Sequence, residues 1–264
     1  MNVAKEKMRA GGVALCAGLR LARTVDFGML AAQAGFDCVY VDMEHSPISL
    51  ETASTICAGC HGLGITPLVR TPSHAPDWIS RVLDGGAQGV IVPHVSTAEQ
   101  AIAVASAARF PPLGHRSVMG LSPALGYRAA PLGTMNQALN DETLLIVMIE
   151  TPQGVANADA IAAVPGVDML LIGSNDLCTE MGIPGELRHP RLREAYETVG
   201  QACERHGKVL GIGGIRGDLD LQRDLLKLGA RFLIAGSDTN YLAAAMRKDV
   251  EGLREVINSA EQPA

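Results

Sequence analysis

The sequence predicts a single (β/α)8 barrel, an α/β fold also called a TIM barrel, and three observations support this fold class. Strand-like and helix-like segments alternate eight times along 264 residues, with no low-complexity linker between them. The length suits one α/β barrel domain. Apolar residues make up 47% of the chain but aromatic residues only 3%, so Val, Ile, Leu and Ala must fill the core. We therefore expect residues 1–264 to form one domain.

The expected elements follow one another with short joints. Strands are predicted at 12–17, 37–42, 65–70, 88–93, 144–150, 168–173, 208–213 and 231–236. Helices are predicted at 28–35, 50–62, 76–84, 97–108, 154–163, 190–206, 219–229 and 239–257. Glycine recurs where a helix should stop before the next strand, at Gly35, Gly85 and Gly229, as repeated helix-to-strand joints require.

One joint, residues 109–142, breaks this pattern. Its prolines and glycines are too frequent for a helix, and a loop of this length in a compact domain is usually functional. We expect it to lie at the catalytic face as a lid or a substrate-selecting arm, with His115, Arg116, Tyr127 and Arg128 on it. A disordered insertion is the alternative.

The last predicted helix carries one apolar stripe along its length. The stripe consists of Leu242, Met246, Val250, Leu253 and Ile257, at steps of three and four residues. It can pack on its own barrel or on that of a neighbouring subunit, and the sequence alone leaves both open.

Charge and hydropathy exclude several classes of protein. The formal charge of −6 and the absence of a basic run argue against a nucleic-acid surface. No apolar stretch approaches the roughly 20 residues of a membrane span. Lys5 and Lys7 precede an apolar run at 13–17, as in a secretory signal, but Arg20 and Arg23 interrupt that run too soon.

The six cysteines show no disulfide-framework spacing, so we expect a cytoplasmic protein. Cys57 and Cys60 have a redox-like spacing, but they fall inside the helix predicted at 50–62. There they are better interpreted as two small helix residues, because reactive pairs of this kind stand at the start of a helix.

Five apolar runs end in polar groups that suit one site for a divalent metal. The groups are Asp42 with His45, Arg70, His94, Glu150, and the stretch Ser174, Asn175 and Asp176. A parallel barrel brings the C-terminal ends of its strands to one face, so we expect these residues to converge. Two carboxylates, a histidine, an arginine and a helix start suit a metal-dependent reaction on a small anion.

Glu150 and Asp176 are the candidate metal ligands. Hard divalent cations such as Mg²⁺ and Mn²⁺ prefer carboxylate oxygens, often with only one or two protein ligands. A strand-ending acid can also cap a helix, and Asp176 could do so for the turn that starts at Leu177.

His45 is the candidate general base, with Asp42 as a supporting residue behind the site. A carboxylate beside a histidine orients it and raises its basicity, and Asp84 is a candidate for this partner. Asp84 stands at a helix end, where the alternative is a solvated side chain. Arg70 offers a fixed cationic fork for an oxyanion or a carboxylate, or else it is a surface arginine.

The distribution of lysines argues against Schiff-base chemistry. The only lysines are Lys5, Lys7, Lys208, Lys227 and Lys248, and Lys208 begins a strand, at the face opposite the catalytic one. A Schiff-base aldolase needs a lysine in its active site. Metal-stabilised enolate chemistry is then the remaining route to cleavage of a carbon–carbon bond.

Several stretches together resemble the HpcH/HpaI family of class II pyruvate aldolases, including the 4-hydroxy-2-oxoheptanedioate and 2-keto-3-deoxy-sugar-acid aldolase types. They are residues 35–45, 69–72, 83–90, 149–151 and 172–177. They occur in order over nearly the whole chain. Departures from the family pattern are Met148 where Gln is frequent, Ser174 where Pro is frequent, and Ser117 where Gly often follows the arginine. These positions border the pocket and bear on the substrate.

The resemblance implies reversible cleavage of a 4-hydroxy-2-oxo acid to pyruvate and an aldehyde. Glu150 and Asp176 would hold Mg²⁺, Mn²⁺ or Co²⁺, and backbone amides near Ser174, Asn175 and Asp176 would receive the pyruvate carboxylate. Arg70 would steady the enolate oxygen. His45, paired with Asp84, would handle the proton of the aldol hydroxyl.

The resemblance also implies a homo-hexamer, a trimer of dimers that exchanges the final helix between neighbours. Two other function classes stay open at this point. One is a condensing or acyl-CoA lyase relative, similar to citrate synthases or citryl-CoA lyases, for which the chain shows no basic entrance of the size of CoA. The other is a barrel that binds a ligand without turnover.

Overall fold

Eight parallel strands close into a barrel in the computed structural model, which describes residues 2–261. Each strand pairs with its neighbour in sequence, and β8 pairs with β1 to close the ring. The strands are β1 (Ala14–Leu19), β2 (Cys38–Asp42), β3 (Thr66–Arg70), β4 (Gly89–Val92), β5 (Leu144–Ile149), β6 (Met169–Gly173), β7 (Val209–Gly213) and β8 (Ala230–Ser237). The predicted fold class and all eight predicted strands are confirmed.

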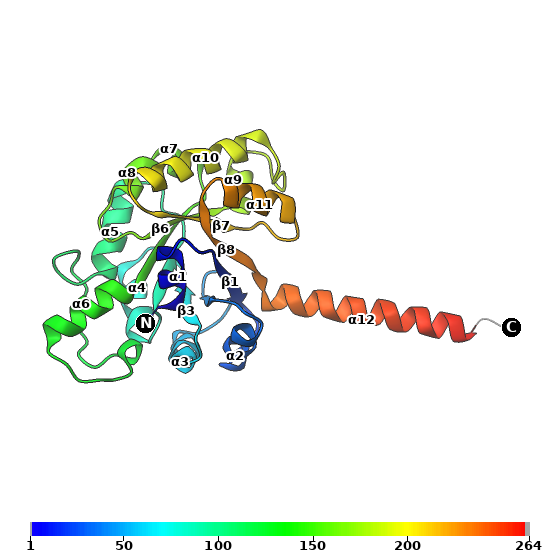
Figure 1. Cartoon of the computed structure of the whole chain (residues 1–264), viewed down its shortest axis with the longest axis horizontal. Coiled ribbons are helices and arrows are strands. Elements are labelled where there is room, and N and C mark those ends of the chain that lie inside the picture. The colour runs from blue at the N-terminus through cyan, green and yellow to red at the C-terminus, as the bar shows by residue number, and fades with distance from the viewer. Residues whose placement is uncertain (1, 262–264) are drawn as a thin grey trace.

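Helices surround the barrel, and the last of them projects away from it (Figure 1). They are α1 (Val3–Arg9), α2 (Asp26–Gln33), α3 (Leu50–Cys60), α4 (Pro76–Asp84), α5 (Ala98–Ala108), α6 (Leu132–Glu142), α7 (Pro152–Ala156), α8 (Ala158–Ala162), α9 (Ser174–Glu180), α10 (Pro190–Arg205), α11 (Leu219–Lys227) and α12 (Asp238–Glu261), with a 3₁₀ turn at Pro123–Leu125. The helix predicted at 154–163 is thus two short helices, interrupted at Asn157. Cys57 and Cys60 are free and buried within α3, as expected.

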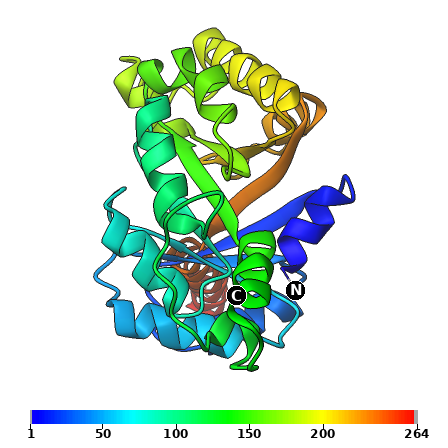
Figure 2. The same cartoon turned by 90° about the vertical axis from the view of Figure 1, so that its left-hand side faces the viewer.

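The prediction for residues 109–142 is wrong in two respects. Residues 132–142 form α6, because Pro131 and Gly133 fall at its start and no proline or glycine follows within it. The segment also lies at the N-terminal end of the barrel rather than the catalytic end. Arg109 binds the carbonyl oxygen of Thr143, directly before β5, and the end of α6 meets Asn2 near the N-terminus (Figure 2). Within one chain this segment is no lid.

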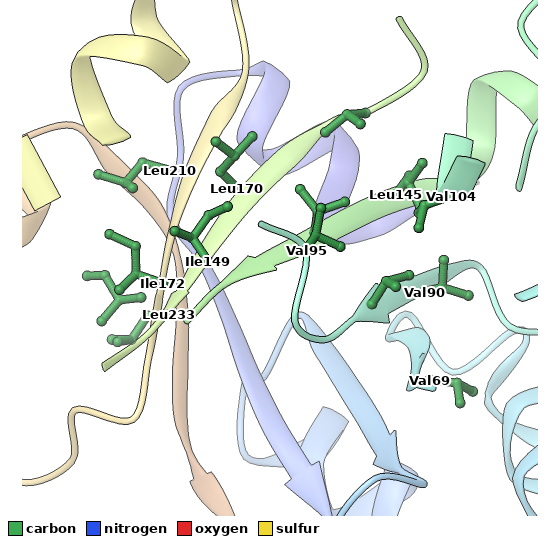
Figure 3. Packing of buried hydrophobic residues seen from close by; sticks show 14 of the residues in the cluster. Val69, Val90, Val95, Val104, Leu145, Ile149, Leu170, Ile172, Leu210 and Leu233 are labelled. Atoms are coloured by element: carbon green, nitrogen blue, oxygen red, sulfur yellow. The ribbon is translucent and has the colours of Figure 1, made fainter. Parts of the chain in front are cut away.

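The core has two layers, set by the alternation of side chains along each strand. Outward residues such as Val69, Val90, Leu145 and Ile172 pack against the helices (Figure 3). Inward residues fill the barrel itself, where α1 contributes to the plug at the N-terminal end: Ala4, Met8, Cys16, Tyr40, Leu68, Ile91, Ile146, Met148, Leu171 and Phe232 are among them.

The apolar stripe of α12 stays exposed over most of its length. Leu242, Met246, Val250, Leu253 and Ile257 are each 49–64% exposed. Figure 1 shows the helix leaving the barrel at the end of β8. Beyond its first turn, α12 does not pack along its own barrel in this structure, and the stripe is left uncovered. No helix among residues 2–261 is long and apolar enough to cross a membrane.

Candidate active site

The inward alternation of the strands delivers the predicted polar side chains to the C-terminal mouth of the barrel. In β5, Ile146 and Met148 face the barrel interior, and Glu150 follows in the same alternation. In β2, Tyr40 faces inward and is followed in this way by Asp42 and Glu44. The mouth is therefore the top layer of the same packing that fills the barrel.

Arg70 and Asp42 form a buried, bidentate ion pair across neighbouring strands. Nε and Nη2 of Arg70 donate to the two carboxylate oxygens of Asp42 over 3.0 and 2.6 Å, and Nε of Arg20 adds a bond of 2.7 Å. Burial opposes the ionisation of Asp42 and is the largest single effect. The hydrogen bonds and charge of Arg70, the His45 backbone N–H and the charge of Arg20 together outweigh it and hold the pKa of Asp42 below its usual range. Asp42 thus holds Arg70 in place.

Glu44 and His94 connect this pair to Glu150. Oε1 of Glu44 lies 3.0 Å from Nε2 of His94, and its Oε2 lies 3.0 Å from Nη1 of Arg70. Nδ1 of His94 lies 3.4 Å from Oε2 of Glu150, which also accepts a bond of 2.9 Å from the His94 backbone N–H. His94 has a φ of +55°, an unusual conformation for a residue with a side chain. The backbone there is bent so that one residue contacts both carboxylates.

Glu150 is a buried carboxylate with an unused oxygen. Burial raises its pKa, as do the charges of Glu44 and Asp176, while the backbone and ring of His94 oppose the rise. A Cβ on Gly173 would lie 2.6 Å from Oε1 of Glu150, so this position needs a glycine. Among residues 2–261, Oε1 has no hydrogen-bond donor. A buried carboxylate with raised pKa and a free oxygen suits a bound cation.

Ser174, Asn175 and Asp176 start α9 directly after β6. The Ser174 side chain is buried and its Oγ lies 2.8 Å from the hydroxyl oxygen of Tyr196, so it points into the core. Asn175 and Asp176 are exposed. Asp176 forms no ion pair within the described chain, yet its charge acts on Glu150. Of the predicted stretch, Ser174 can contribute only its backbone.

The donor set fits a hard cation held by few protein ligands. Within residues 2–261, no group of three or more His, Cys, Asp or Glu side chains converges as a complete metal cage. Two carboxylates with free oxygens remain, Glu150 and Asp176. Mg²⁺ commonly binds through one or two carboxylates while water and substrate complete its coordination, so these residues suit it.

His45 and Asp84 do not meet within one chain, contrary to the expected pairing. His45 stands at the mouth, where its half-exposed ring has Nε2 3.7 Å from Glu44. Asp84 ends α4 at the opposite end of the strands and accepts a bond of 2.6 Å from the buried Arg116. The α4 helix runs back along the barrel from the mouth, so its last residue lies a full strand length away.

Residues 27–245 match the family described as HpcH/HpaI aldolase/citrate lyase. The chain belongs to this family. It is 43% identical over 246 residues to a 4-hydroxy-4-methyl-2-oxoglutarate aldolase of Hapsidospora irregularis, which covers 92% of this chain and 91% of the relative. It is 33% identical over 226 residues to a 5-keto-4-deoxy-D-glucarate aldolase of Citrobacter koseri, covering 84% and 85%.

A solved structure gives the same result for the fold of this HpcH/HpaI protein. The crystal structure of an HpcH/HpaI aldolase from Desulfitobacterium hafniense DCB-2 superposes with a TM-score of 0.90 at 30% identity, over 98% of this chain and 97% of that one. The resemblance found in the sequence is confirmed. So is the class of enzyme: the chain is an aldolase, a carbon–carbon lyase.

One residue at the mouth of this aldolase, Glu44, escaped the sequence-based prediction, and another, His94, was expected there without a role. Glu44 stands between two predicted site residues, and its even spacing from Asp42 was the signal that it faces the same way. His94 ends an apolar run and was expected at the mouth for that reason, but no part in the reaction was assigned to it. Its contacts with both carboxylates depend on a positive φ, which the sequence does not indicate.

Proposed function

We propose that the chain is a class II pyruvate aldolase that cleaves a 4-hydroxy-2-oxo acid to pyruvate and an aldehyde, with Mg²⁺, Mn²⁺ or Co²⁺ held by Glu150 and Asp176. The observation that carries this is the pair of carboxylates with unused oxygens at the mouth, one of them buried with a raised pKa. A bound divalent cation would act as a Lewis acid toward the oxo group of the substrate.

The chain's own residues then divide the remaining work. Arg70, fixed by Asp42 and Glu44, stabilises the negative oxygen that develops on the pyruvate half. Backbone amides at Ser174, Asn175 and Asp176 receive its carboxylate. Only two of the five N–H donors of the Arg70 guanidinium bond to Asp42. Arg70 can therefore bind a substrate oxygen without breaking its ion pair with Asp42.

His45 moves the proton of the 4-hydroxyl group. Its ring is exposed toward solvent at the mouth, and its backbone N–H donates to Asp42 over 3.1 Å, which fixes the start of the loop. When the bond between C3 and C4 breaks, its electron pair stays on the pyruvate half, and the hydroxyl proton passes to the imidazole.

The positions of the lysines argue against a Schiff-base mechanism and favour one in which a bound cation would supply Lewis-acid chemistry. Lys208 donates to the carbonyl oxygen of Val167 over 2.8 Å at the N-terminal end of the barrel, and Lys5 binds Asp168 there. Lys7 binds Asp37, and Lys227 lies on α11. No lysine among residues 2–261 takes part in the contacts at the mouth.

The test of this function is metal dependence of cleavage, followed as pyruvate release from a 4-hydroxy-2-oxo acid. EDTA should abolish the activity, and Mg²⁺, Mn²⁺ or Co²⁺ should restore it. Borohydride with pyruvate should trap no covalent adduct. Full activity in EDTA, or a trapped adduct, would overturn the mechanism.

We infer further that the chain assembles as a homo-hexamer, a trimer of dimers that exchange α12. An apolar cleft of about 560 Å³ lies beside the base of α12, with Leu21, Phe27 and Leu30 among its lining residues. It is the complement of the exposed stripe of α12, and reciprocal exchange between two copies would cover both surfaces. Met246→Asp with Leu253→Asp should lower the mass measured by light scattering, whereas Asp249→Ala on the same helix should not.

The assembly would also explain Asp84 as a partner of His45. The segment beside Asp84 exposes apolar side chains, Val118, Met119 and Leu121, each 41–51% exposed. We propose that this end of one barrel covers the mouth of another, so that Asp84 orients His45 across subunits. Mixed assemblies of His45→Ala and Asp84→Asn chains should then regain part of the activity that each variant lacks. The absence of recovery would reject the pairing.

We expect the protein to function in the cytoplasm, because all six cysteines are free and buried in the folded chain.

A further inference from the structure

A second cleft at the mouth lies on the side away from Glu150. It has a volume of about 270 Å³ and is formed by β7, β8 and the starts of α9 and α12. Its polar lining consists of Arg20, Tyr40, Asn175, Arg216, Ser237 and Asn240. No Asp or Glu of the described chain is among the lining residues. The charge of Arg20 is balanced by Asp42, so the uncompensated positive charge of this cleft is that of Arg216.

Arg216 is an exposed arginine at the edge of this cleft, and it has no charged partner within the described chain. Within residues 2–261 its guanidinium forms no ion pair and no hydrogen bond; it lies over the ring of Tyr241, 6.0 Å from the ring centroid. The nearest acid along the chain is Asp218, but it accepts bonds of 2.5 and 2.8 Å from Arg188 and caps α11. Arg20, by contrast, is committed to Asp42.

Glycines keep the cleft open around this arginine. A Cβ on Gly236 would lie 3.3 Å from Nε of Arg216 and 3.1 Å from the ring of Tyr241. A Cβ on Gly214, where φ is +82°, would lie 3.0 Å from Nδ2 of Asn175. Side chains at these two positions would crowd the two donors that line the cleft.

The amide side chains add further donors. Oδ1 of Asn240 accepts from the backbone N–H and the hydroxyl of Ser237, over 3.2 and 2.8 Å, so its Nδ2 is left for another acceptor. The Asn175 side chain forms no hydrogen bond within the described chain, and its neighbour is Asp176. The cleft is thus a set of unused donors next to the residues that hold the pyruvate half.

We propose that this cleft binds the distal carboxylate of a dicarboxylic 4-hydroxy-2-oxo acid, with Arg216 as its main contact. This proposal rests on the proposed function, because it gives a binding site to the distal end of a substrate whose pyruvate half lies at Asn175 and Asp176. An unpaired arginine fork with flanking amides matches a carboxylate, and a charged hydrogen bond made only with the substrate favours it over a neutral analogue. The second product is then itself an oxo acid rather than a neutral aldehyde.

The test compares two substrates that differ only at the distal end: 4-hydroxy-2-oxoglutarate and 4,5-dihydroxy-2-oxopentanoate, in which a hydroxymethyl group replaces the carboxylate. Arg216→Gln should lower kcat/KM for the dicarboxylate by about 10- to 100-fold, as expected for a charged hydrogen bond. The neutral substrate should change little, so the preference collapses. Arg216→Lys should keep part of the preference for the dicarboxylate. The control Arg223→Gln, which removes an exposed arginine on α11, should keep all of that preference.

Two results would overturn the proposal: an equal loss for both substrates in Arg216→Gln, or no loss for the dicarboxylate. Deuterium exchange into pyruvate separates this failure from failure of the proposed function, since pyruvate has no distal carboxylate. If the wild type exchanges pyruvate protons but Arg216→Gln leaves the substrate preference intact, only the assignment of the cleft falls. If the wild type exchanges none, both fall.

Discussion

The two ends of the barrel both contain buried ion networks, but they differ in how completely their groups are satisfied. At the N-terminal end, Arg109 makes five hydrogen bonds, to Gly166, Asn140, Thr143 and Asp168. Asp168 accepts from Arg109 and from the Leu145 backbone N–H, and it forms an ion pair with Lys5. At the mouth, the buried Glu150 keeps an unused oxygen, and the exposed Asp176 and Arg216 form no ion pair within the described chain. The network around Arg109 and Asp168 is saturated, whereas the charged groups at the mouth are not.

This difference separates charges that hold the fold from charges that await a ligand. A buried group that lacks a partner costs free energy, and the unused oxygen of the buried Glu150 is the case at the mouth where a bound ligand would supply the partner. Burial lowers the pKa of Lys5, and Asp168 opposes that effect. Burial raises the pKa of Glu150, and the acids around it add to the rise. Substitutions at the two ends should therefore affect different properties.

The largest effect on activity is expected for Glu150→Gln. Loss of a metal ligand should reduce cleavage at least about 1,000-fold, since Lewis-acid stabilisation is worth several kcal/mol. The melting temperature of the metal-free protein should stay the same or rise, because the variant removes a carboxylate whose burial opposes its charge. Steady-state kinetics and calorimetry of the same preparation measure both. A large loss of stability would place Glu150 with the structural charges.

Asp168→Asn should have the opposite profile. It leaves Lys5 and Arg109 without their carboxylate, and breaking a buried ion pair of this kind costs about 3–5 kcal/mol. The kcat of the folded fraction should be unchanged. Urea unfolding and active-site titration check the two parts. Impaired kcat in fully folded enzyme would show that the N-terminal end also serves catalysis.

His45→Ala should affect one half of the reaction more than the other. Cleavage should fall about 100-fold, near the lower end of what a general base contributes, because the ring is half exposed. Proton exchange of pyruvate should fall less, whereas Arg70→Ala should impair both. Equal losses in both reactions for His45→Ala would mean that it acts on the enolate.

Asp42→Asn should give the smallest effect, one that depends on pH. The folded-state pKa of Asp42 is lowered, so its ionised form contributes stability above the unfolded-state pKa, and this contribution is lost as the pH falls through the folded-state value. The variant should be about 1–3 kcal/mol less stable at pH 7. The difference should shrink below about pH 4. A difference that is constant with pH would show that the effect is not electrostatic.

The sequence revealed the strands and the strand-end groups because both depend on local pattern. The apolar run before Glu150 is strand-length, and alternation within it sets the direction of that side chain. Asp84 was placed correctly at the end of a helix, but its pairing with His45 is not formed within one chain, because that pairing depends on where α4 ends in space. The α6 helix was missed because Pro131 and Gly133 at its start mask the regular residues after them. The sequence did not single out Arg216 as a site residue, because the absence of a charged partner can be recognised only when the neighbouring side chains are known.

The measurement that tests the central claim most directly is deuterium incorporation into the methyl group of pyruvate, followed by mass spectrometry. This exchange reaction requires only the residues at the mouth of the barrel, because it involves neither a second product nor cleavage of a carbon–carbon bond. We predict saturable incorporation with Mg²⁺, Mn²⁺ or Co²⁺, none with EDTA, and none in Glu150→Gln, while Arg216→Gln exchanges like the wild type. Incorporation that is undiminished by EDTA or by Glu150→Gln would contradict a metal-assisted enolate at Glu150 and Asp176.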